Sequence, residues 1–484
     1  MSGDMKRDAF GKRPLYYYLK PDGAIAQSDR VLDLLEKGVP RKLSRQGLMS
    51  YLTYGAVVSP LTLIDGVNML PAGHELANGK ATRFWKPDFT PRYDDLAVAQ
   101  EAVSAAVRAA VERGMGDGHE VSAAFLSGGI DSGAIVAVMR QLHDGEIRTY
   151  CVKHDDDSTD ESEWARKVAE CNGTKHTVLH LSDRMMRDGI LKALSSYDQP
   201  SIDGLNFWFA SKLVREAGEK RILSGEGGDE LFAGYDRFLK HMLAYRWAAR
   251  FEKCGSRLWG GPVGGLLERF APNEKFRKLG ALMAAQCDPY SIPRKVFSAH
   301  QVLELLRPEL AEVPIDYQAS VTSAFAPGRR DLVNRISWLE LQNVTTDMWL
   351  RDGYQTAAAH GLEIITPLLD RELAELLFRI PGTMKCCPEY LKPLLVRAAG
   401  KGLPMDCVTR KKQGFTLPFE RYFSGELKDM IDSFLEGRES RLFRPEALRR
   451  LGRMYRGGHV NWSRVWVLFA VEYWCRENKV EIGI

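Results

Sequence analysis

The chain of 484 residues carries 67 lysines and arginines against 63 acidic residues, a formal net charge of +4. A charge so near zero argues against a nucleic-acid partner, whose phosphates require a clustered basic surface. Hydrophobic residues make up 45% and charged residues 27% of the chain, which is an ordinary composition for a globular protein. The length allows two or three domains. The longest apolar run near the C-terminus, 465–471, is too short to span a membrane.

The N-terminus and the cysteines both predict a cytoplasmic protein. The first residues, MSGDMKRDAFGKRP, lack the apolar stretch of a secretory signal. We therefore expect the eight cysteines to be reduced. Because no CxxC pair or Cys/His cluster has ligand spacing, the sequence argues against zinc or iron-sulfur binding. The oligomeric state is left open, and a homodimer is allowed.

The predicted elements begin with an N-terminal region that contains a hairpin, interrupted by turn residues at 21–23 and 71–73. A helix is predicted over 98–117. Strands and helices then alternate: strands over 121–126, 147–153, 177–181 and 221–223, and helices over 134–142, 162–171 and 206–218. This alternation predicts an α/β fold with a mainly parallel sheet. From about residue 240 the pattern is helical, and the tryptophans at 208, 259, 349, 466 and 474 are interpreted as packing residues.

A glycine loop after the first of these strands is the most informative stretch, Ser127-Gly128-Gly129-Ile130-Asp131-Ser132. Paired glycines allow a sharp turn, and the start of the next helix offers unpaired N–H groups to an anion. The serines add hydroxyl donors. A carboxylate beside a phosphate makes chemical sense with a divalent cation between them, which points to Mg²⁺. Taken alone, the loop could equally be a tight turn with a helix cap.

A second glycine-rich loop favours the phosphate-binding interpretation. The segment 224–230 (SGEGGDE) also follows a short apolar strand and also carries acids among glycines. Two such loops at the carboxyl ends of parallel strands meet where α/β sheets bind ligands. We therefore predict that Asp131 and Asp229 form a metal pair.

These motifs resemble a known family. The loop SGGIDS is similar to the pyrophosphate loop of N-type ATP pyrophosphatases, and residues 223–235 (LSGEGGDELFAGY) resemble the matching loop of asparagine synthetases. Further resemblances lie in residues 8–17 (DAFGKRPLYY), 70–76 (LPAGHEL), 198–200 (DQP), 410–415 (RKKQGF) and the pair Trp466 and Trp474. The resemblance implies a truncated glutaminase remnant and connector over 1–95 and a synthetase domain over 96–484. Within the latter, it implies an ATP-binding α/β core of about 118–240 and a helical remainder, 241–484.

The resemblance also implies a reaction and residue roles. A substrate carboxylate, aspartate or a related acid, would attack the α-phosphate of ATP, and ammonia or another amine would then displace AMP. Ser127, Gly128, Gly129 and Ser132 would bind the pyrophosphate, Asp131 and Asp229 would ligate Mg²⁺, and Gly225 would lie against the nucleotide. Glu226 would take a proton from the attacking nitrogen, and Lys412 would neutralise charge at phosphorus. Each acid or lysine also has a simpler interpretation, as a loop acid or a solvated basic residue.

The first departure from the family concerns glutamine. The family catalyst is an N-terminal cysteine, whereas here position 2 is Ser2 and the first cysteine is Cys151. We therefore expect no glutamine hydrolysis by this chain alone. Ammonia, another amine or a separate glutaminase would supply the nitrogen.

The second departure lies in 350–367, where Tyr354-Gln355 and Ile365 stand at positions that are Asp-Arg and Arg in the family. The lost guanidinium groups could have clamped a carboxylate or formed structural ion pairs. Asp203 lies near the family's aspartate-binding position, but its simpler role is a helix N-cap. Two alternatives stay open: a macrolactam-forming lasso-peptide cyclase or another secondary-metabolite amide synthetase, and a degenerate nucleotide-binding protein. Retention of Glu226, which β-lactam synthetases replace by tyrosine, favours an intermolecular nitrogen donor.

Overall fold

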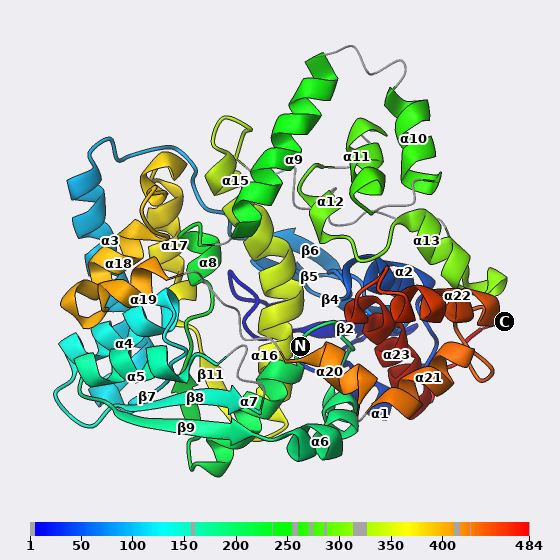
Figure 1. Ribbon diagram of the computed structural model, residues 1–484, viewed down its shortest axis with the longest axis horizontal. Coiled ribbons are helices and arrows are strands. Elements are labelled where there is room, and N and C mark those ends of the chain that lie inside the picture. Colours follow the sequence, from blue (N-terminus) through cyan, green and yellow to red (C-terminus); the bar gives the residue numbers. More distant parts are fainter. Residues whose placement is uncertain are drawn as a thin grey trace.

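The central element of the protein is a five-stranded parallel sheet, in the order β11-β10-β7-β8-β9 (Figure 1). The computed structural model describes residues 5–155, 160–234, 236–253, 260–270, 274–284, 288–312, 327–410, 417–425 and 427–483. The strands are β7 (Ala123–Phe125), β8 (Arg148–His154), β9 (Lys175–Leu181), β10 (Arg221–Leu223) and β11 (Glu363–Ile365). Chain order reverses between β7 and β10, so the sheet has its ligand-binding switch point there.

Helices cover both faces of this sheet. Successive residues of a strand point to opposite faces and therefore pack against different helices. Ala124 of β7 packs in a core with α3 (Leu96–Met115), α4 (Ile130–Leu142) and α5 (Ser162–Cys171). Its neighbour Ala123 packs instead with residues of α7 (Leu205–Glu216) and α16 (Arg351–Ala358). The predicted α/β fold is confirmed, and the four predicted strands match β7 to β10 to within a few residues.

Two elements of the core were not predicted. Strand β11 is only three residues long and follows directly on a helical stretch, so its sequence offers no alternation to detect. Helix α6 (Asp183–Ser196) contains Gly189, an unfavourable residue in a helix interior. That glycine lies against the Phe209 ring, where a Cβ atom would come within 2.7 Å of the ring, so tertiary packing explains it.

The N-terminal region forms two small antiparallel sheets, which confirms the predicted hairpin. One has the order β1-β5-β6 and the other β3-β2-β4. Their strands are β1 (Met5–Lys6), β2 (Tyr16–Leu19), β3 (Ile25–Ser28), β4 (Val67–Met69), β5 (His74–Ala77) and β6 (Lys80–Arg83). Helices α1 (Val31–Glu36) and α2 (Arg45–Tyr54) complete this part.

In the described residues after β10, the regular elements other than β11 are helical. The longer helices are α9 (Asp236–Lys253), α10 (Gly260–Phe270), α11 (Glu274–Ala284), α15 (Leu332–Glu340), α17 (Arg371–Phe378), α21 (Lys428–Glu436), α22 (Pro445–Arg456) and α23 (Trp462–Glu477). The shorter α-helices are α8 (Gly228–Leu231), α12 (Ser291–Arg294), α13 (Ala299–Leu305), α18 (Pro393–Ala399), α19 (Met405–Thr409) and α20 (Phe419–Ser424). Short helical turns in this region are η3 (Pro308–Leu310), η6 (Pro367–Leu369), η7 (Gly382–Lys385) and η8 (Gly400–Gly402), and a longer segment is η5 (Leu341–Leu350). One further turn, η1 (Asp117–His119), lies earlier, between α3 and β7.

Helices α15, η5 and α16 follow one another without a break, and the middle segment η5 is a π-helix. The three cross the centre of the view in Figure 1. No helix in the described parts of the chain is both long and apolar enough to cross a membrane. A cytoplasmic location stays a prediction.

The N-terminal strands and the C-terminal helix α23 share one hydrophobic core. Tyr16 and Tyr51 are buried in the same cluster as Trp466 and Trp474. The Tyr51 hydroxyl donates to the carbonyl of Val467 at 3.0 Å, a hydrogen bond between residues 416 positions apart. The two ends of the chain are therefore packed as one unit.

Candidate active site

Two glycine loops meet at the carboxyl ends of β7 and β10. The first, residues 127–132, connects β7 to α4, and the second, residues 224–230, connects β10 to α8. A Cβ atom added to Gly225 would lie 2.8 Å from both Asp131 Cβ and the Ser132 nitrogen. Only a glycine allows this approach, since real Cβ atoms do not come so near. The sequence thus permits the two loops to touch, as expected from the strand pattern.

The first loop is already organised around its serines. The Ser127 N–H donates to Ser132 Oγ at 3.2 Å, and the Gly129 N–H lies 3.3 Å from Ser127 Oγ. Gly128 has φ of 70° and packs against the backbone of the following helix α5, so a side chain has no room there. The start of α4 adds its positive dipole end. The serine hydroxyls and the start of α4 are groups of the kind that bind phosphate oxygens, and we call this loop the phosphate cradle.

Lys392 joins the two loops through their carboxylates. Its ammonium pairs with Asp131 and lies 2.6 Å from Asp229 Oδ1, and its side chain is 2% exposed. Burial lowers the pKa of this ammonium, but the attraction of Asp131 and Asp229 outweighs burial and raises the pKa above its ordinary value. Lys392 is therefore a buried cation held by two acids.

Sequence reasoning missed Lys392, which precedes α18. A signal was present, because the charge interrupts an otherwise apolar run, 391–396 (LKPLLV). A lysine in such a run is fully buried only when it is paired. Its backbone φ of 56° is also unusual for a residue with a side chain, a feature that occurs more often at functional sites.

The pair of acids suits magnesium in its donor chemistry. Mg²⁺ is commonly held by one or two carboxylates together with substrate phosphates, and Asp131 and Asp229 converge beside the phosphate cradle. Among the residues whose placement is described, no cluster of three or more His, Cys, Asp or Glu side chains could hold a metal alone. A metal at this position would therefore depend on oxygen ligands from the nucleotide. The Mg²⁺ site stays a prediction.

Glu226 lies in the second loop between Gly225 and Gly227. Burial, followed by the nearby carboxylates of Glu230 and Asp203, raises the pKa of Glu226 to about 8. A carboxylate with so high a pKa accepts protons readily once it is ionised. A raised pKa suits a general base and also occurs in structural acids.

The two loops line a cavity of about 330 Å³, which we call the nucleotide cavity. It contains every predicted residue of the two loops except Gly128, together with Lys392 and Arg410. The Arg410 guanidinium pairs with Glu161 at 2.5 Å, which fixes both side chains at the cavity wall. The predicted residues are thus brought to one place, while their roles stay predictions.

A larger cavity of about 710 Å³, the substrate cavity, adjoins the first. Both are lined by Ser127, Glu226 and Asp229, so the two cavities meet at the second glycine loop. The π-helix η5 supplies five residues to its wall: Asn343, Val344, Asp347, Met348 and Trp349. π-Helical segments are frequent at functional sites.

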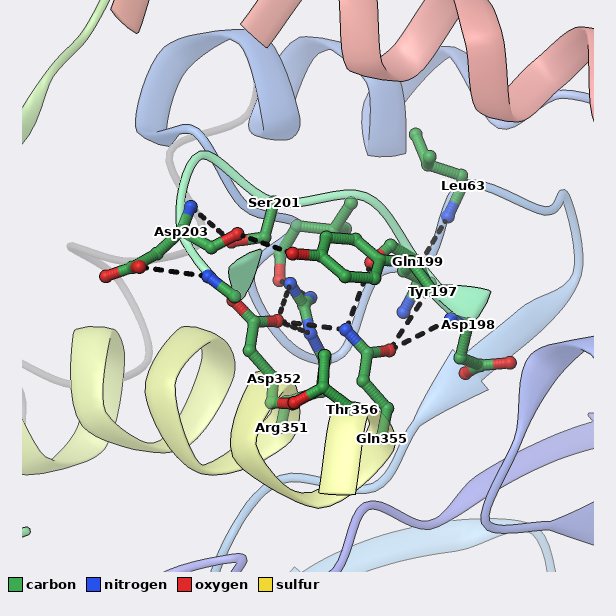
Figure 2. Close-up of polar contacts among 12 residues, drawn as sticks. Leu63, Tyr197, Asp198, Gln199, Ser201, Asp203, Arg351, Asp352, Gln355 and Thr356 are labelled. Carbon is green, nitrogen blue, oxygen red and sulfur yellow. Dashed lines mark hydrogen bonds and ion pairs between the residues drawn. The ribbon is translucent and has the colours of Figure 1, made fainter. Parts of the chain in front are cut away.

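A buried polar network fixes one wall of the substrate cavity (Figure 2). Gln355 of α16 accepts hydrogen bonds from the backbone N–H groups of Asp198 and Gln199, at 3.0 and 3.3 Å. The same side chain donates to Asp352, which also pairs with Arg351. The network holds the loop that ends at Asp203, and Asp203 lines the cavity.

The network explains part of the departure from the family. Tyr354 hydrogen-bonds Asp29 at 2.6 Å, Gln355 holds the loop, and Ile365 is a strand residue of β11. None of the three lines either cavity. These three side chains lie behind the cavity walls rather than on them.

Three individual predictions have different outcomes. Asp203 is not the N-cap of α7: Gly204 is, and Asp203 instead accepts a hydrogen bond from the Gly204 N–H at 2.9 Å. Lys412 lies outside the described residues. Trp349 was interpreted as a packing residue, but it lines both cavities.

The other tryptophans follow the interpretation where they are described. Trp208, Trp466 and Trp474 are buried in one hydrophobic core, as expected for packing residues. Trp259 lies outside the described residues.

Comparison with known proteins agrees with these motifs. The sequence profile of the family described as asparagine synthase matches residues 102–476, and that of the glutamine amidotransferase domain matches residues 2–87. The chain is 25% identical to asparagine synthetase [glutamine-hydrolyzing] 1 of Bacillus subtilis (strain 168) over 446 residues, which cover 89% of this chain and 68% of the relative. It is 24% identical to asparagine synthetase [glutamine-hydrolyzing] 3 of the same organism, over 84% of this chain and 64% of the relative.

A plant relative matches a shorter segment. Asparagine synthetase [glutamine-hydrolyzing] 2 of Lotus japonicus is 31% identical over 197 residues, 36% of this chain and 32% of the relative. The chain spans about two thirds of the length of the two bacterial relatives. Because the first profile covers well over half of its residues, the chain belongs to the asparagine synthase family, a family of ligases.

Proposed function

We propose that this protein is an ATP-dependent, AMP-forming ligase that joins a substrate carboxylate to an amine. The observation that carries the proposal is the meeting of the two glycine loops, which places a phosphate cradle and Glu226 at the junction of two cavities. The family supports ATP-dependent amide ligation in general. Aspartate or a related acid stays the predicted acceptor.

The first step forms an acyl-adenylate. A carboxylate oxygen attacks the α-phosphorus of ATP, the bond from that phosphorus to the β-phosphate bridging oxygen breaks, and pyrophosphate leaves. We assign Ser127, Gly129 and Ser132, which line the nucleotide cavity, to bind the leaving pyrophosphate, the two serines through their hydroxyl groups. Magnesium, held by Asp131 and Asp229, would supply charge neutralisation to the phosphates. Lys392 adds a fixed positive charge next to those acids.

The second step forms the amide. The amine nitrogen attacks the acyl carbon, the carbon–oxygen bond to AMP breaks, and the nitrogen must lose a proton. Glu226 lies where the nucleotide and substrate cavities join, so its carboxylate is the group we assign to accept that proton. Lys412, in a segment similar to a family motif, is assigned to neutralise charge at phosphorus during the first step.

The nitrogen donor we assign is ammonia or another amine, supplied directly or by a separate glutaminase. Among the given residues the first cysteine is Cys151, and none of them corresponds to the N-terminal cysteine that the family uses on glutamine. Glutamate release from glutamine by the purified protein would contradict this assignment.

The proposal is tested with pyrophosphate exchange and with hydroxylamine. The purified protein, ATP, magnesium and a panel of carboxylic acids are incubated with radiolabelled pyrophosphate, and acid-dependent labelling of ATP reports adenylation. Hydroxylamine then serves as a small amine that converts the acyl-adenylate to a hydroxamate. Acid-dependent exchange together with AMP and hydroxamate supports the proposal, whereas release of ADP and phosphate contradicts it. A cyclic product from a single peptide would favour the macrolactam-forming alternative.

A further inference from the structure

The walls of the substrate cavity are mainly aromatic and aliphatic. Six of the residues that line it are Phe207, Val344, Met348, Trp349, Phe419 and Trp462. The rings of Phe419 and Trp462 are stacked with their centroids 4.1 Å apart, which makes one wall flat and apolar. Cavities of about 300 to 1,000 Å³ with such walls enclose drug-sized ligands. Aspartate is much smaller than these ligands and has no apolar group to bury.

The charged side chains on the same walls are mostly acidic, and two of these acids are already paired, Glu161 with Arg410 and Asp229 with Lys392. Glu161, Asp203, Glu226, Asp229 and Asp347 all line the cavity. Among the described lining residues, Arg294 is the one cation.

The positive charge of Arg294 is already matched. Its guanidinium pairs with Glu340, with Nε 3.1 Å from Oε1, and Glu340 is 1% exposed. Arg294 therefore offers a substrate little uncompensated positive charge.

This charge pattern constrains the acid that can bind. One carboxylate of the substrate must reach the junction near Ser127, where it reacts with ATP. The described cations at the walls of the two cavities, Arg294, Lys392 and Arg410, already pair with acids, so a second carboxylate would be buried without a cation of its own, which is strongly unfavourable. Aspartate would carry such a group, since its α-carboxylate remains when its side chain is activated.

We infer that the acceptor of this enzyme is a monocarboxylic acid with a large apolar body, which fills the substrate cavity while its carboxylate lies at the junction with the nucleotide cavity. The inference rests on the proposed function, because it names the acid that is adenylated. The inferred acid differs from aspartate, the acceptor expected from the family resemblance. The reason for the difference is the set of residues that line the cavity.

A homologous series of acids tests the inference. Phenylacetate, 3-phenylpropionate and 4-phenylbutyrate differ by one methylene each, and aspartate is the comparison. Acid binding is measured by calorimetry in the presence of a non-hydrolysable ATP analogue, and adenylation by pyrophosphate exchange. A methylene buried in an apolar cavity improves the dissociation constant by about fourfold. Aspartate should bind at least about tenfold more weakly than the best member of the series.

Two substitutions in the cavity wall, one that fills the cavity and one that enlarges it, test the same inference separately. Ala210→Phe on α7 adds a ring to the cavity and should weaken 4-phenylbutyrate by about tenfold or more, with a smaller effect on phenylacetate. Val344→Ala on η5 enlarges the cavity and should shift the preferred acid towards a longer chain. Ala105→Phe, at an exposed position of α3, is the matched control.

The outcomes separate the inference from the proposed function. Tighter binding along the series that responds to both cavity variants supports the inference. Binding and exchange with aspartate, but not with the apolar acids, overturns the inference and leaves the proposed function intact. Absence of binding by either class overturns the assignment of this cavity. Binding of the apolar acids that responds to the variants, without exchange, supports the cavity assignment and contradicts the proposed function.

Discussion

The ammonium of Lys392 lies 2.6 Å from Asp229 Oδ1 and also pairs with Asp131, so one lysine links the two glycine loops of the site. The acids come from loops that follow β7 and β10, and the lysine precedes α18. Removal of Lys392 leaves both acids without their shared cation, whereas removal of one acid leaves the buried lysine paired with the other. Substitution of single residues can distinguish their roles.

Lys392→Met should destabilise the protein by about 1 to 3 kcal/mol, because it leaves two partly buried carboxylates without their shared cation. Chemical denaturation measures this loss. Magnesium should recover part of the stability in the variant, since a cation that binds the folded state stabilises it. Lys401→Met, at an exposed lysine, is the control and should change stability by no more than about 0.5 kcal/mol. Equal stability of the two variants would contradict the assigned ion pair.

Asp131→Asn should lower acid-dependent pyrophosphate exchange by about two to three orders of magnitude. The substitution removes a negative charge that we assign to magnesium binding, and loss of such electrostatic stabilisation costs about 3 to 4 kcal/mol in a transition state. The exposed Asp117→Asn provides a matched control. Normal exchange in Asp131→Asn would refute the phosphate-loop assignment.

Glu226→Gln should leave exchange largely intact while amide formation falls by about 100- to 10,000-fold. The amide side chain is nearly isosteric with the acid but cannot accept the proton of the attacking nitrogen. Both activities are measured on the same preparation with the same acid. If they fall equally, Glu226 supports the nucleotide site and the base lies elsewhere.

Amide formation should rise with pH through about 8, the raised pKa of Glu226. The rate should rise with pH because a general base works only when it is deprotonated. Burial together with Glu230 and Asp203 keeps Glu226 protonated below that pH. The rate of hydroxamate formation is recorded from pH 6 to 9 with saturating acid. The residual activity of Glu226→Gln should lack this rise, and an identical profile in both proteins would assign the titration to another group.

Gln355→Leu should lower the free energy of unfolding by about 1 to 3 kcal/mol. The change leaves the buried backbone N–H groups of Asp198 and Gln199 without their acceptor (Figure 2). Gln27→Leu removes a glutamine from an exposed position and should cost no more than about 0.5 kcal/mol. Equal costs would show that the buried network does not hold the 198–203 loop.

The strand and loop pattern allowed much of this site to be predicted. Parallel strands place their following loops at one edge of the sheet, so Asp131 and Glu226 could be expected near each other. Lys392 could not, because its approach depends on how α18 packs in three dimensions. The role of Gln355 was also hidden, since the sequence cannot distinguish a lost substrate clamp from a buried structural residue.

The substrate cavity was the least predictable part. Its wall comes from η5, a π-helix, whereas periodicity reasoning assumes the α-helical repeat. Trp349 was assigned to packing because aromatic residues in helices usually pack in the core. The cavity becomes visible only when segments from several parts of the chain are brought together.

The shared core of Tyr16, Tyr51, Trp466 and Trp474 has a practical consequence for protein engineering. The segment 1–95 resembles a domain remnant, yet its removal would expose large aromatic surfaces on the C-terminal helices. An isolated 96–484 fragment would thus be prone to aggregate, whatever its catalytic residues. Expression vectors for structural work should therefore retain the N-terminal strands, and fusion partners are better attached outside this core than inserted between its two halves.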